Sequence, residues 1–296
     1  MVYNNYWKLR LKELPSKGVF YNKYATIKIK TLTLKDIKYL ATINKDNATF
    51  IIDEILESSL ILKNLEFGNI CLPDRMYMVF WLRVNSYINS GGYNLTLKKC
   101  ECGEEEKKDI ALTDFDLVYF NINKERKFVL PNSGYTMEFC VPTIKYKDDI
   151  YNTWGDIKDK EILDMMLWCN FKNEEETISN KYDLLNELDA MDYIYIKSYL
   201  DDFMFGFSNK IDVYCDKCNR KTTYEFEIND YGMFGAISMF DIMKNIMYIS
   251  EVCGYQVKEY HSWVEIELMF ENAKRIVEER NENLEKTQGS MNKFKR

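Results

Sequence analysis

The sequence predicts an α+β fold with two duplicated strand-helix-hairpin units, each carrying a cysteine knuckle, followed by a C-terminal helical segment. Three observations support this. Short motifs recur in the same order at an offset of about 110 to 116 residues. The 296 residues include only 12 Gly and 4 Pro, which favours long regular elements over flexible linkers. After residue 233 the apolar spacing becomes purely helical.

The duplication rests on six collinear matches. An LP-x-x-G-type turn opens each unit, an alternating strand follows, and a threonine (Thr33 or Thr143) is placed to cap the next helix. The matched segments are 14–18 with 130–134, 25–29 with 135–141, 33–37 with 143–150, 84–88 with 196–200, the cysteine pairs, and 112–115 with 228–231. Convergent use of common turn and strand residues stays the alternative. The predicted boundaries are 1–122, 123–232, 233–286 and a disordered tail, 287–296.

Each unit is expected to contain helices and then a hairpin with cysteines at its tip. Apolar residues at helical spacing indicate helices, and alternation between two short segments indicates a hairpin. The expected helices are 47–59, 73–87, 162–170 and 188–202, and the hairpins pair 93–98 with 109–112 and 210–214 with 222–228.

The C-terminal segment is expected to form two helices. The first spans 237–252, carries an apolar stripe that includes Met239, Phe240, Met243 and Met247, and ends at a glycine, Gly254. A capping box at 262–265 (SWVE) then starts a helix running to about residue 285, whose last turns are almost all polar.

Four cysteines at the two hairpin tips predict a metal site. Cys100 and Cys102 lie at one tip, and Cys215 and Cys218 at the other. Four thiolates are the tetrahedral set of a structural zinc ion, and such a closed site has no open position for catalysis. The Cys100–Cys102 spacing is one residue shorter than usual, and plain thiols in turns are the alternative.

No other group of residues indicates catalysis. Four further cysteines lie in apolar or helical stretches and are interpreted as core residues. They are Cys71, Cys140, Cys169 and Cys253. The single histidine, His261, precedes the capping box, where a polar residue at a helix start is the simplest account. Runs of acidic residues lack a cation-binding loop pattern and are interpreted as solvated faces. We therefore expect a protein that is not an enzyme and has no small-molecule substrate.

Composition argues against nucleic acid and membrane partners. The net charge is −7 and the pI is about 5.1, so there is no basic footprint for phosphates. A zinc-ribbon module that binds nucleic acid nevertheless stays the second hypothesis, to be separated by a salt-dependent gel shift. The sequence shows no apolar run long enough to span a membrane and no signal peptide, so folding in the cytosol is expected.

Several motifs together resemble the baseplate hub and hub-assembly proteins of contractile-tailed bacteriophages. They are 14–18 (LPSKG), 32–36 (LTLKD), 82–87 (LRVNSY), the first knuckle, 114–116 (DFD) and the C-terminal 262–265. The resemblance covers most of 14–120 and, more loosely, 233–285. It implies a non-enzymatic part in building the central hub of the tail, in the cytoplasm of the infected host or in the finished virion. The implied partners are other phage tail proteins.

Overall fold

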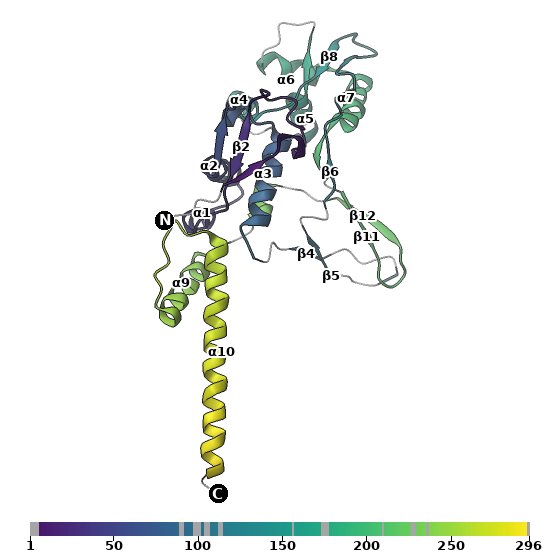
Figure 1. The fold of residues 1–296 in the computed structure, drawn as a ribbon. Helices are drawn as coiled ribbons and strands as arrows, with labels where there is room; N and C mark the ends of the chain where they lie inside the picture. The colour runs from purple at the N-terminus through teal and green to yellow at the C-terminus, as the bar shows by residue number, and fades with distance from the viewer. Residues whose placement is uncertain are drawn as a thin grey trace.

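The computed structural model has mixed helices and small antiparallel sheets, which confirms the α+β class (Figure 1). It describes residues 6–88, 92–96, 102–103, 107–111, 115–155, 157–172, 178–208, 210–225, 229–234 and 237–294. Within these ranges, no helix is both long and apolar enough to cross a membrane.

The first part of the chain builds an antiparallel sheet of three strands in the order β1-β2-β3. The alternation predicted for 25–29 is confirmed, because Ile27 and Ile29 of β2 are fully buried. The strands are β1 (Trp7–Leu9), β2 (Thr26–Ile29) and β3 (Leu60–Lys63), and the helices are α1 (Leu34–Leu40), α2 (Ala48–Ser59) and α3 (Leu72–Asn85). Two short 3-10 helices, Leu11–Glu13 and Phe67–Asn69, connect them.

The second part builds another antiparallel sheet of three strands, in the order β7-β8-β9. Its strands are β7 (Lys127–Val129), β8 (Thr136–Phe139) and β9 (Cys169–Phe171), and its helices are α4 (Ile144–Trp154), α5 (Lys160–Trp168), α6 (Ile178–Glu187) and α7 (Ala190–Phe203). In both parts the middle strand leads into a helix with a threonine N-cap, and the third strand follows a helix directly. A common origin of the two units stays a prediction.

Two-stranded pairings follow each part. The hairpins are formed by β4 (Gly92–Thr96) with β5 (Lys107–Ala111), and by β11 (Lys210–Tyr214) with β12 (Lys221–Glu225). A further short pairing joins β6 (Leu117–Val118) to β10 (Gly206–Phe207), so strands far apart in sequence meet beside α3. The last elements are α8 (Asp230–Phe234), α9 (Met239–Cys253) and α10 (Trp263–Phe294).

The two LP-x-x-G-type turns are held in the same way. Asp74 on α3 accepts the backbone N–H of Ser16 at 2.8 Å, and Asp192 on α7 accepts the N–H groups of Asn132 and Ser133 at 2.9 and 2.8 Å. Both carboxylates are fully buried. The turn glycines, Gly18 and Gly134, each have φ of 71°, a left-handed conformation that favours glycine. The turn motif therefore recurs because a buried aspartate binds its backbone.

Pairs of helix starts are joined by short antiparallel bridges. Thr33 bridges Ser262, so α1 and α10 begin side by side, and Cys71 bridges Thr143, which joins α3 to α4. The predicted capping box at 262–265 is confirmed by the Ser262–Glu265 hydrogen bonds of 3.0 and 3.3 Å. Gly254 has φ of 66° and ends α9 as predicted.

The described side chains form two hydrophobic cores. One core belongs to the second part of the chain and contains residues between Phe120 and Phe205. The other core combines the first part with β11, α8, α9 and α10. Helix α9 contributes Ile242 and Ile249 to it, and α10 contributes Trp263 and Ile266. The C-terminal helices are therefore packed on the first part of the chain rather than on the second.

The C-terminal helices differ from the sequence-based expectation in two respects. Most of the apolar stripe of α9 faces solvent: Met239, Phe240, Met243 and Met247 are 41 to 74% exposed. Ile246 of the stripe is half-buried against the core, and Ile242 and Ile249 are buried. Apolar spacing alone does not say which face of a helix meets the core. The second difference is length, because α10 continues to Phe294, whereas the sequence favoured an end near residue 285 and a disordered tail over 287–296. The last turns of α10 project away from the other elements (Figure 1).

Candidate metal centre and buried ion-pair network

The β11–β12 hairpin presents two of the predicted metal ligands. The strands stay in register to the pair Tyr214–Lys221, after which the Cys215 N–H donates to the Arg220 carbonyl at 3.0 Å. The Asn219 N–H then donates to the Cys215 carbonyl at 2.8 Å, and Asn219 has a left-handed φ of 56°. This tight turn holds Cys215 and Cys218 on the same side of the hairpin tip, as the sequence predicted for a knuckle.

Cys102 comes from the region between β4 and β5 and meets the second knuckle. Its Sγ lies 3.7 Å from the Sγ of Cys215, and the Sγ atoms of Cys102, Cys215 and Cys218 all lie within 4.8 Å of one another. Gly103 follows with φ of 88°, a conformation suited to glycine in a knuckle turn. The fourth predicted ligand, Cys100, lies outside the described residues.

The sulfur spacing suits a shared metal ion. A tetrahedral zinc site with Zn–S bonds of about 2.3 Å places its sulfurs about 3.8 Å apart. The 3.7 Å separation of Cys102 and Cys215 is close to that value, and none of the described cysteines forms a disulfide. Cys215 is buried, while Cys102 and Cys218 are exposed. The three thiols could therefore bind one metal ion from a position at the protein surface.

The other four cysteines do not join this cluster. Cys169 and Cys71 are buried, and burial raises the pKa of the Cys71 thiol well above its ordinary value. Cys140 is half-buried and its Sγ lies 3.4 Å from the amide oxygen of Asn170. Cys253, at the end of α9, is exposed, which differs from the core position that the sequence suggested.

His261 has a structural environment. Its Nδ1 accepts the backbone N–H of Lys258 at 2.8 Å, and its Nε2 lies 2.9 Å from the hydroxyl of Tyr255. The His261 carbonyl accepts the N–H of Leu34 at 2.9 Å as part of the bridge between α1 and α10. These contacts support the interpretation of His261 as a polar residue at a helix start.

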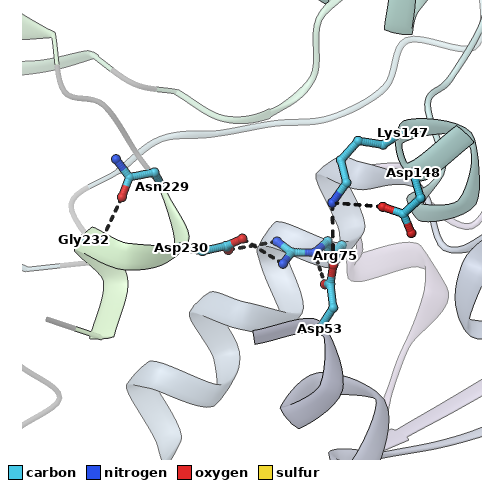
Figure 2. Close-up of polar contacts among 7 residues, drawn as sticks. All are labelled: Asp53, Arg75, Lys147, Asp148, Asn229, Asp230 and Gly232. Atoms are coloured by element: carbon cyan, nitrogen blue, oxygen red, sulfur yellow. Dashed lines mark hydrogen bonds and ion pairs between the residues drawn. The ribbon is translucent and has the colours of Figure 1, made fainter. Parts of the chain in front are cut away.

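A buried ion-pair network, which the sequence did not reveal, lies at the junction of four helices (Figure 2). Arg75 on α3 donates through both Nη atoms to the two carboxylate oxygens of Asp230 on α8, each at 2.9 Å. Its Nε donates to Asp53 on α2 at 2.5 Å. Lys147 on α4 lies 3.5 Å from the other oxygen of Asp53 and 3.7 Å from Asp148. The network thereby connects α2, α3, α4 and α8.

The charges at the centre of this network are almost completely removed from water. The side chains of Arg75 and Asp230 are 5% and 7% exposed, and that of Asp53 is 17% exposed. Burial by itself lowers the pKa of Arg75, but the adjacent Asp230 and Asp53 carboxylates outweigh it and raise that pKa. Asn229 accepts the Gly232 N–H at 2.7 Å and so shapes the turn that presents Asp230. The planar guanidinium of Arg75 suits a contact with both carboxylate oxygens of Asp230.

Comparison with known proteins identifies the family. Residues 7–232, which include both sheets, the network and the described knuckles, match the family described as T4 bacteriophage base plate protein. The chain belongs to this family. The resemblance to phage baseplate proteins is thereby confirmed, and the family implies a structural component of the phage tail baseplate that interacts with other tail proteins. The match ends before α9 and α10. No curated protein and no solved structure matches the chain significantly.

Proposed function

We propose that this baseplate protein is a non-enzymatic structural or assembly component of the central hub of a contractile tail. The observation that carries the proposal is the family match over 7–232. The motifs shared with hub and hub-assembly proteins support the finer assignment to the hub. The described polar clusters support a structural role, because their hydrogen bonds are made within the chain. Arg75 binds Asp230, and Asp74 and Asp192 accept backbone N–H groups of the two turns.

The proposal includes a structural zinc ion held by Cys102, Cys215, Cys218 and Cys100. Its support is the sulfur-only donor set, with three Sγ atoms within 4.8 Å of one another. Such a site joins the tip between β4 and β5 to the tip of the β11–β12 hairpin, two segments more than 100 residues apart in sequence. A closed site of this kind stabilises the fold and leaves no coordination position for a substrate.

The hub role is tested by fractionating infected cells and purified virions. Mass spectrometry is expected to detect the protein in tail or baseplate subassemblies, and deletion of its gene is expected to stop hub assembly. Cryo-EM of purified virions then distinguishes a permanent component from a transient assembly factor. The proposal is wrong if the protein never associates with tail proteins in infected cells.

The zinc site is tested by metal analysis of protein purified without added chelator. We expect about one zinc per chain and its loss in Cys215→Ser, with lower stability. Cys253→Ser is the matched control, because Cys253 is exposed and lies outside the cluster. Cys100→Ser should weaken zinc binding as strongly as Cys102→Ser. Metal-free protein with unchanged stability in Cys215→Ser would refute this part of the proposal.

A further inference from the structure

In the last turns of α10, the described side chains are not covered by the rest of the described chain. Residues 278–286 are all exposed, and the helical backbone continues to Phe294. Residues 278–294 correspond to about 25 Å of helix. Their described ion pairs are Lys286–Glu282 at 3.7 Å and Arg275–Glu279 at 3.8 Å. The side chains involved are 67 to 73% exposed, and such pairs add little stability. An isolated helix of this length is marginal in water, and Gly289 weakens it further.

A heptad repeat runs through the whole of α10. Starting with Trp263 as position a, every seventh residue is apolar. These a positions are Trp263, Phe270, Val277, Leu284 and Met291, and the d positions are Ile266, Ala273, Arg280, Thr287 and Phe294. Position a is apolar in every heptad, whereas Arg280 and Thr287 interrupt position d. Apolar residues at a seven-residue period favour packing of helices along their length.

The first half of this seam already packs within the chain. Trp263, Ile266 and Ala273 are buried, and Phe270 lies against Tyr248 of α9 with ring centroids 5.5 Å apart. The seam then continues beyond this contact without cover, since Leu284 is 59% exposed. The uncovered part is therefore a continuation of an interface that the chain already uses.

The charges around the uncovered seam favour a second copy of the same chain. In a coiled coil the e and g positions face the partner and select it by opposite charge. Here those positions are uncharged: Asn281 and Gln288 at e, and Asn283 and Ser290 at g. The charged residues lie at the outer b, c and f positions, so two copies can approach without repulsion between their flanks. They are Glu278, Glu279, Glu282, Glu285 and Lys286.

We propose that α10 self-associates through its a/d seam from Val277 onward and makes this protein a dimer. Arg280 at position d is the one charged residue in the uncovered seam. Its aliphatic stem can cover apolar surface while the guanidinium stays in water. Such a residue lowers the stability of a coiled coil. The inference is independent of the zinc site and of the hub role.

The test compares two exposed leucines on the same helix. Leu284 is at position a and 59% exposed, whereas Leu268 is at position f and 55% exposed. Sedimentation equilibrium of the full chain at about 50 μM, with reductant to exclude disulfides, should give twice the 35.4 kDa chain mass. The Leu284→Glu variant should be monomeric and the Leu268→Glu variant dimeric. Their circular dichroism spectra should differ only by the C-terminal helix that Leu284→Glu loses with the dimer. Arg280→Leu should tighten the dimer.

Two results would overturn the inference. A monomeric wild-type chain at this concentration would mean that another protein, or nothing, covers the seam. Equal loss of the dimer in Leu284→Glu and Leu268→Glu would mean that the contact does not use the a/d face. Because both leucines are exposed in the single chain, neither substitution removes a contact of its hydrophobic cores.

Discussion

Replacement of Arg75 by methionine tests the interpretation that the buried network holds the helices of this baseplate protein together. Methionine has a similar length and no charge, so the change removes the guanidinium with little loss of packing volume. It leaves Asp230, whose side chain is 7% exposed, without its two 2.9 Å hydrogen bonds. Asp53 keeps a contact with Lys147 at 3.5 Å and is 17% exposed. The main penalty is therefore expected from Asp230.

The size of the effect follows from the burial of the pair. Removing one partner of a buried, hydrogen-bonded ion pair costs about 3–5 kcal/mol, because the other charge stays buried without compensation. The loss of unfolding free energy in Arg75→Met should fall in this range. Asp230→Asn keeps an acceptor for Arg75 and removes a negative charge, so a smaller loss of about 2 kcal/mol is expected. In the double variant, Arg75→Met with Asp230→Asn, no buried charge remains at position 230. The loss of unfolding free energy should therefore be smaller than the sum of the two single losses by at least about 1 kcal/mol.

The assay is urea unfolding of the full chain, followed by tryptophan fluorescence and circular dichroism. The shift in unfolding midpoint gives the change in stability if both signals coincide and the slope is unchanged. A matched control is Lys38→Met, because Lys38 makes a single ion pair with Glu259 at 3.0 Å near the surface. That pair should contribute less than about 1 kcal/mol. A loss in Arg75→Met no greater than in the control would refute the reasoning.

Two carboxylates give opposite pH effects. Burial raises the pKa of Asp164 from 3.8 to about 6. Its ionisation therefore weakens the fold as pH rises through this window, and Asp164→Asn should raise the unfolding free energy by about 1–2 kcal/mol near pH 8 but not near pH 3.5. Burial opposes ionisation of Asp192, but hydrogen bonds from Ser133 and Asn132 lower its pKa. Asp192→Asn should cost about 1–2 kcal/mol near pH 7, and less as pH falls below about 4, measured by urea unfolding.

Local signals in the sequence predicted the local structure well. The cap residues Thr33, Thr143 and Ser262 each accept the hydrogen bond expected of an N-cap. These contacts depend on residues three positions apart, so a short motif contains all the information. The strand β3 was missed because it is only four residues long and follows α2 without a break. The helix α6 was missed because it lies in a largely polar stretch.

Contacts between distant segments could be predicted only where both partners carried a recognisable pattern. The knuckles met this condition, and the described structure brings Cys102, Cys215 and Cys218 together. The ion-pair network did not, because Arg75 and Asp230 are isolated charged residues separated by 155 positions. Nothing near either residue marks it as buried. Their pairing depends on how α8 returns to α3, which is a property of the whole fold.

The position of the network explains how a polar junction can serve a structural protein of the baseplate. A buried ion pair adds little net stability compared with apolar residues, but a misplaced partner is strongly unfavourable. Arg75 therefore allows α8 one docking position, in which Asp230 meets both Nη atoms. The α9–α10 pair follows α8 and packs on the same core. A fixed α8 thus fixes the starting point of the chain segment from which α10 projects. If this reasoning is right, Arg75→Met should loosen α8 and the α9–α10 pair in hydrogen exchange before it affects the second core around Phe120.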